Sequence, residues 1–396
     1  MSASNVIITP TNNTRRFGRK RLWHLIALLL LCLEVLVAAH HHKTGNEYIT
    51  FGTLWASGNA ANHGLNPYAA YPESFLCDYT IYGYPIQFRD LNLNPPWALP
   101  FMQALSRLPL NRFAQVWALL TGICLLMGCI ILILWQPGLQ KRQLLWFVLC
   151  PPTLETIFSG QIYAWPFLLG VLASAFHKKG NLFATGIAIG IIVAARPTMG
   201  FWVLLLFLCG YRKIAAVSSG TILTAYALPL VIYGPGIYVE WGQAFGGDKH
   251  WMSPMNIAII PLFIRHGHKS WGVAIAILIS LCACCWTAWK RPDFISTSGI
   301  ALCLGIICAP LAWMHYLLFV APFFMAREWT LLPTIAAGLF FLEWAPISDA
   351  SFGIVCLIGT AMILAYFVVS SVNRPRANHH TPRGDPGCLI NGAGSY

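Results

Sequence analysis

The segment ICAPLAWMHYLLF at residues 307–319 places three side chains suited to chemistry inside an apolar run. Trp313, His315 and Tyr316 follow the helix-breaking Pro310. An imidazole with an ordinary pKa of about 6.5 exchanges protons near neutral pH. Aromatic neighbours add stacking surfaces and a hydroxyl group. The segment predicts a proton-transfer or phosphate-binding site, and the alternative is a structural histidine packed at a helix end.

Two further polar groups stand at the ends of apolar runs. Arg196 precedes Pro197 in VAARPTMG, and the residue before a proline is a probable helix boundary. We expect its guanidinium to face a cavity and to bind a phosphate, with a snorkelling membrane anchor as the alternative. Gln161, in GQIYAWPF, has a side-chain amide suited to binding sugar hydroxyls. The alternative is that it caps a helix or makes a hydrogen bond between helices.

A base for an acceptor hydroxyl would come from a carboxylate or from His315. In the first long polar segment the acids available for this role are Glu47, Glu73, Asp78 and Asp90, although acids in loops are mostly solvated. Glu155 is a weaker candidate. It lies within an apolar run, where an acid is costly and therefore often functional, but this cost falls near the membrane surface.

The composition identifies a membrane as the surroundings of these groups. The chain is 57% hydrophobic and 10% charged, whereas a soluble domain carries about 25% charged residues. The formal net charge of +12 does not indicate nucleic-acid binding, because basic residues fall in pairs between apolar runs, as in cytoplasmic loops. No loop cysteines have metal-ligand spacing, so we expect neither a metal nor a cofactor.

Apolar segments recur along almost the whole chain, and a membrane span needs about 20 such residues. We predict an all-α polytopic membrane protein with about 10–12 transmembrane helices. Two of its segments, 198–211 and 315–326, are short enough to be half-helices. The candidate crossings are residues 22–39, 113–135, 144–159, 161–177, 181–196, 198–211, 213–235, 271–289, 295–312, 315–326, 329–345 and 352–373.

The distribution of basic residues predicts the orientation. A basic N-terminus of residues 1–21 precedes one membrane domain, residues 22–373, and the polar tail 374–396 is expected to be disordered. The positive-inside rule places both termini in the cytoplasm. Long loops at 40–111 and 236–270 then lie outside, on the same side as the polar motifs described above.

The first outer loop is polar but rich in aromatic residues. Phe51, Trp55 and Asn59 follow a helical spacing, and Gly64 suits the C-cap of that helix. We expect an amphipathic helix lying on the membrane surface. A second apolar interface helix is predicted to begin at Asn94, in the sequence NPPW.

The order of these motifs resembles glycosyltransferase family 87, over roughly residues 20–370. The motifs that carry the resemblance are Asn66-Pro67-Tyr68, Asn94-Pro95-Pro96, Gly160-Gln161, Arg196-Pro197 and Pro310 to Tyr316. Members of this family are multi-span enzymes of the GT-C superfamily that take sugars from polyprenyl phosphates.

The resemblance implies a GT-C-like bundle that transfers a sugar, with mannose weakly favoured, by an inverting displacement. The donor would be a polyprenyl-phosphate sugar and the acceptor a lipid-linked or cell-envelope glycan, at the outer face of the cytoplasmic membrane. The implied catalytic residues are His315, Glu47 and Asp90. The implied substrate-binding residues are Arg196, Gln161, Trp313, Tyr316, Trp55 and Asn94.

Two positions depart from the family pattern. Thr50 stands where an acid commonly precedes the tryptophan-containing outer helix, and Met314 where an acid often separates the tryptophan from the histidine. The identity of the base therefore stays open, and an inactive family member is one alternative. A transporter or flippase is another, although it would favour internal repeats and mid-span charges, and these are nearly absent.

Overall fold

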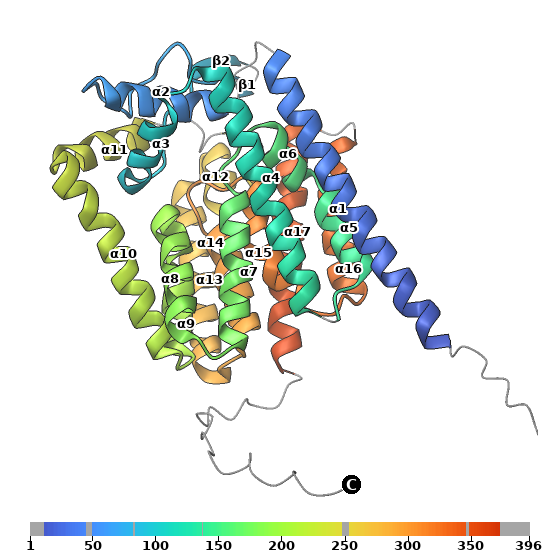
Figure 1. Ribbon diagram of the computed structural model, residues 1–396. Helices are drawn as coiled ribbons and strands as arrows, with labels where there is room; N and C mark the ends of the chain where they lie inside the picture. The colour runs from blue at the N-terminus through green and yellow to red at the C-terminus, as the bar shows by residue number, and fades with distance from the viewer. Residues whose placement is uncertain are drawn as a thin grey trace, which may run out of the picture.

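Figure 1 shows the protein as a computed structural model that describes residues 12–44, 50–81, 84–136, 138–247, 253–345 and 348–372. Helices dominate these residues, which confirms the all-α membrane fold. Glu47 and the tail 374–396 lie outside the described residues.

Helix occurs in each of the predicted crossing segments. Five helical stretches are long and apolar enough to cross a membrane by themselves, Leu22–His40, Leu110–Trp135, Arg212–Tyr233, Lys269–Lys290 and Ser351–Val372. The others are shorter or broken, as the sequence predicts for 198–211 and 315–326. The bundle consists of α1 (Asn12–Thr44), α4 (Leu110–Trp135), α5 (Lys141–Leu149), α6 (Pro151–Phe158), α7 (Ala164–Lys178), α8 (Leu182–Ala195), α9 (Phe201–Leu208), α10 (Arg212–Tyr233), α13 (Lys269–Lys290), α14 (Phe294–Ile307), α15 (Leu317–Met325), α16 (Leu331–Leu339) and α17 (Asp349–Val372).

Small residues bring neighbouring helices close together, as is usual where lipid removes the hydrophobic drive for association. On α8, a Cβ added to Gly186 would lie 2.6 Å from Val217 of α10. Ser218 of α10 donates a hydrogen bond to the Gly186 carbonyl at 2.9 Å. This tight pair fixes α8, whose last residue, Ala195, precedes Arg196.

A second group of elements, here called the cap, covers one end of the bundle (Figure 1). Both ends of the described chain, at Asn12 and Val372, lie at the opposite end of the bundle. The cap consists of α2 (Thr50–Asn62), β1 (Leu76–Ile81), β2 (Tyr84–Arg89), the 3-10 turn η1 (Pro96–Ala98), α3 (Leu99–Leu105) and α11 (Gly236–Gly247). The short helix α12 (Ile259–Arg265) follows below α11.

The cap agrees with the expectation for the first outer loop in its helix and adds a hairpin to it. A helix forms at α2 and ends before Gly64, which has φ +68° as a left-handed cap requires. One face of α2 packs closely on α3: a Cβ at Gly58 would meet the Met102 carbonyl oxygen at 2.3 Å. The antiparallel hairpin β1–β2, in which Leu76 pairs with Arg89, was not predicted from the sequence.

Candidate active site

A polar cavity of about 290 Å³ lies where the cap meets the bundle. Its walls come from the start of α2, the segment after β2, the ends of α6 and α8, and the 3-10 turn η4 (Met314–Tyr316). Its polar and aromatic lining consists of Thr50, Thr53, Phe75, Asp90, Asn92, Asn94, Glu155, Ser159, Gln161, Tyr163, Arg196, Trp313, His315 and Tyr316.

The cavity brings together most of the site residues predicted from the sequence, although these are far apart along the chain. Trp55 is not among them. It lines a separate shallow pocket on the cap, and its Nε1 donates to the Leu108 carbonyl at 2.9 Å. The predicted residues that line the polar cavity are His315, Asp90, Arg196, Gln161, Trp313, Tyr316 and Asn94.

Arg196 sits at the point where Pro197 stops α8. Its Nη2 donates to the Tyr163 hydroxyl at 2.6 Å, and its guanidinium carbon lies 5.4 Å and 5.3 Å from the ring centres of Tyr163 and Tyr316. The Asp90 carboxylate also acts on it electrostatically. Its buried Nε has no hydrogen-bond partner among the described residues, so the guanidinium keeps a donor for an anionic ligand.

His315 is paired with Glu155 of α6. Its Nδ1 lies 3.0 Å from the Glu155 Oε2, and its ring packs on Tyr163 with centres 4.4 Å apart. The His315 side chain is 2% exposed, whereas that of Glu155 is 28% exposed. Within the part of the chain that the structure describes, the buried Nε2 of His315 has no partner.

The segment after β2 forms the cap side of the cavity. The Thr53 hydroxyl donates to the Asp90 Oδ2 at 3.3 Å. Asn92 accepts from the Asn94 Nδ2 at 2.9 Å, and among the described residues the buried Oδ1 of Asn94 has no partner. Burial raises the pKa of Tyr68 well above its ordinary value, so its phenol stays protonated and donates to the Asn94 carbonyl at 3.2 Å.

Gln161 connects the bundle to α2. Its Nε2 donates to the Thr50 hydroxyl at 2.8 Å, so the glutamine amide fixes the side chain of Thr50 at the wall of the cavity. The preceding Gly160 has φ +66°, and its carbonyl accepts from the Trp117 Nε1 at 2.8 Å. This left-handed turn directs Gln161 into the cavity.

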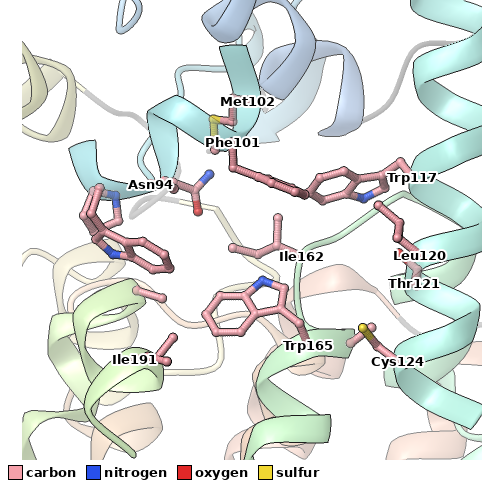
Figure 2. Close-up of a pocket in the computed structure, with 15 residues that line it drawn as sticks. Asn94, Phe101, Met102, Trp117, Leu120, Thr121, Cys124, Ile162, Trp165 and Ile191 are labelled. Carbon is pink, nitrogen blue, oxygen red and sulfur yellow. The ribbon is translucent and has the colours of Figure 1, made fainter. Parts of the chain in front are cut away.

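An apolar pocket of about 350 Å³ adjoins the polar cavity and shares Asn94 and Ile162 with it. Figure 2 shows the rings of Phe101, Trp117 and Trp165 around one hollow, with Asn94 at its rim. Trp97 and Trp165 meet edge to face at 6.1 Å. The outer wall reaches the surface of the bundle, since Phe101 is 51% and Leu120 of α4 38% exposed.

A second mostly apolar pocket, of about 500 Å³, lies on another side of Arg196. Trp241 and Phe245 of α11 line it together with Pro310. It shares Arg196 and Tyr316 with the polar cavity. The guanidinium therefore stands where one polar and one apolar space meet.

From the sequence, Tyr163 had no predicted role and Glu155 only a weak one. Tyr163 contacts both Arg196 and His315, so it organises the centre of the site. Its position three residues after Gly160 was the only signal available. For Glu155 the signal was an acid inside an apolar run, and the structure adds the histidine partner. No group of three or more metal-ligating side chains occurs in the described ranges.

Comparison with known proteins gives one finding. The model of glycosyltransferase family 87 matches residues 92–312, more than half of the chain. The matched range contains Asn94, Glu155 and Arg196, and ends shortly before His315. No curated protein matches the chain.

Proposed function

Because the chain belongs to glycosyltransferase family 87 and is a membrane glycosyltransferase, we propose that it uses a polyprenyl-phosphate sugar as donor. The acceptor is a glycan or glycolipid of the cell envelope, and the transfer inverts the anomeric carbon. The family assignment favours transfer over the transporter or flippase hypothesis.

The observation that carries this proposal is the contact between the polar cavity and the apolar pocket at Asn94 and Ile162. A polyprenyl-phosphate sugar has an anionic, hydroxyl-rich head and a long hydrocarbon chain. The head fits a cavity lined by Arg196, Asn94 and Gln161. The chain fits the aromatic pocket, whose exposed wall at Phe101 and Leu120 gives it a route towards the bilayer.

Arg196 is the proposed partner of the donor phosphate. Guanidinium groups bind phosphates with charge-assisted hydrogen bonds, and stabilising a leaving oxygen accelerates bond cleavage. The acceptor oxygen attacks the anomeric carbon, the bond from that carbon to the phosphate oxygen breaks, and its electron pair leaves with the polyprenyl phosphate. Asp90 and His315 line the same cavity as candidate bases.

The proposed location is the cytoplasmic membrane, with the cap on the outer face. Basic residues gather at the end of the bundle opposite the cap: Lys141 lies over the Trp23 ring near the start of α1, and Lys178 donates to the carbonyl of Trp135 at the end of α4. The positive-inside rule makes this end cytoplasmic.

The test is transfer of label from polyprenyl-phosphate mannose to a lipid extract by membranes that carry the protein. Mannose is tried first and arabinose second, with Arg196→Gln at matched expression as the comparison. We expect labelled product from one donor with the wild type and about 10²–10³-fold slower transfer with the variant. No transfer from either donor would contradict the proposal and favour an inactive protein.

A further inference from the structure

Glu155 is the acidic group best placed to touch a substrate beside His315. It lies on α6, which starts at Pro151 after Cys150 breaks the backbone away from α5. This break brings α6 against the η4 turn that carries His315. One carboxylate oxygen, Oε2, is paired with the His315 Nδ1 at 3.0 Å, and the side chain lines the polar cavity.

The two partners differ in access to the cavity. His315 is 2% exposed and its Nε2 is buried, while the Glu155 side chain is 28% exposed. A substrate that enters the cavity therefore reaches the carboxylate before it reaches the imidazole. The histidine, fixed by stacking on Tyr163, instead holds the carboxylate in one orientation.

We infer that Glu155 is the catalytic base of the transfer and that His315 is its positioning residue. This inference rests on the proposed function. His315 donates its Nδ1–H to the Glu155 Oε2. The acceptor hydroxyl loses its proton to the carboxylate while its oxygen bonds to the anomeric carbon. The phosphate–sugar bond breaks, and the polyprenyl phosphate leaves with the electron pair and can later receive the proton.

Two residues near the pair carry no carboxylate. Thr50 accepts a hydrogen bond from the Gln161 amide and cannot act as a base. Met314, 3% exposed, supplies no carboxylate beside His315. Glu155 reaches His315 from α6 and supplies one.

Asp90 is the competing base, and its surroundings direct it elsewhere. Its carboxylate accepts from Thr53 and acts on Arg196, the proposed phosphate ligand. A carboxylate held by Thr53, whose charge acts on that guanidinium, is suited to balancing the charge of the arginine. His315, the partner of Glu155, instead packs on Tyr163, whose hydroxyl accepts from the same arginine.

The first test compares Glu155→Gln with Glu343→Gln. Glu343 is a nearby acid that interacts electrostatically with Glu155 and does not line the cavity. General-base catalysis contributes about 10²–10⁴-fold. We therefore expect the kcat of Glu155→Gln to fall by about that factor with the KM for the donor nearly unchanged, and Glu343→Gln to keep its rate. Wild-type kcat in Glu155→Gln would overturn the assignment.

The second test uses azide, which attacks the anomeric carbon without losing a proton. In purified Glu155→Ala, with a thermal unfolding temperature matched to the wild type, azide should restore donor consumption and give a glycosyl azide. Asp90→Ala should show no such rescue. Rescue of Asp90→Ala alone, or loss of transfer in Glu155→Ala without any azide product, would overturn Glu155 as the base.

The role of His315 has its own readout. An asparagine at this position can still donate a hydrogen bond to Glu155, whereas phenylalanine cannot. Misplacing a reacting group by about 1 Å can cost about 10²-fold in rate. We expect His315→Asn to retain more of the kcat than His315→Phe by about this factor, and equal losses would contradict a positioning role. Wild-type protein that consumes no polyprenyl-phosphate sugar at all would refute the proposed function itself, whichever variant is compared.

Discussion

The polar cavity and the apolar pocket meet at Asn94 and Ile162, but their walls are held together differently. In the cavity each charged group has a defined partner: Arg196 bonds Tyr163, and Glu155 pairs with His315. Such partners are needed because an unpaired buried charge is costly. In the pocket, rings such as those of Trp97 and Trp165 pack by shape.

This difference suggests a division of work between the two regions. Substitutions in the cavity should change the rate of transfer, because the groups there act on charge that develops during reaction. Substitutions in the pocket should change the affinity for the donor chain and leave the chemical step intact, because apolar contacts act equally on substrate and transition state.

Outside the Glu155–His315 pair, the largest effect is expected at Arg196. Replacing it by glutamine removes the guanidinium that faces the leaving phosphate, and loss of one such donor typically costs about 10²–10³ in kcat. The kcat of Arg196→Lys should lie between those of the wild type and Arg196→Gln. Lysine keeps the positive charge but lacks the planar set of N–H donors with which a guanidinium binds phosphate. The measurement is kcat and KM with donor varied at saturating acceptor. Arg112→Gln, at an exposed arginine near the start of α4, is the control, and equal losses in Arg196→Gln and Arg112→Gln would exclude a phosphate role.

The next effect concerns Gly160, whose carbonyl accepts from Trp117 of the apolar pocket and which precedes Gln161 of the polar cavity. A Cβ there would lie 2.5 Å from Phe51, in addition to the left-handed φ of +66°. Overpacking costs about 1–3 kcal/mol and the left-handed backbone about 1–2 kcal/mol, so Gly160→Ala should lower both the unfolding temperature and transfer.

Gly64→Ala is the matched comparison, because Gly64 has φ +68° but nothing within 4 Å of an added Cβ. Only the backbone cost of about 1–2 kcal/mol applies there. Unfolding temperatures of both variants are measured in the same detergent. If Gly160→Ala and Gly64→Ala lower them equally, the Phe51 side chain moves aside without cost and the added Cβ at Gly160 is not overpacked.

A smaller effect should follow from filling the apolar pocket. Leu120→Trp replaces a leucine on the exposed wall of the pocket with a bulkier indole ring. We expect the KM for a long-chain donor to rise by about tenfold, equivalent to about 1.4 kcal/mol, with kcat unchanged. A donor with a short isoprenoid chain should be almost unaffected.

Leu119→Trp provides the control for this change. Leu119 is the preceding residue of α4, is 47% exposed and does not line the pocket. If both variants raise the KM equally, the donor chain lies against the outside of α4 and not in the pocket. If kcat falls with Leu120→Trp, the division between affinity and rate is wrong.

The sequence predicted those parts of the molecule that depend on local patterns. Helix in every crossing segment follows from apolar run lengths, and the end of α2 follows from Gly64. The gathering of Arg196 and His315 at one end of the bundle follows from alternation of the spans, because each polar motif falls at a span end on the same side.

Pairings between distant segments could not be predicted in the same way. The contact of Glu155 with His315 joins residues 160 positions apart, and depends on the break between α5 and α6 that brings α6 against η4. The hairpin β1–β2 was missed because its residues lie in a segment dominated by turn residues and aromatics. Trp55 matched a helical stripe, but periodicity does not say which side of α2 faces the cavity.

The smallest effect is expected at Trp55, which tests whether the shallow pocket belongs to the site at all. Trp55→Phe keeps an aromatic ring but removes the hydrogen bond from Nε1 to the Leu108 carbonyl. A typical hydrogen bond contributes about 0.5–1.5 kcal/mol, so the unfolding temperature should fall slightly. Donor KM and kcat should stay within about twofold, because Trp55 lines neither the polar cavity nor the apolar pocket.

The kinetics of Trp55→Phe are measured with short and long glycan acceptors. If only the long acceptor shows a raised KM, the shallow pocket, which also contains Asn59, Asn62 and Arg107, extends the acceptor site across α2, and the division into two regions needs a third.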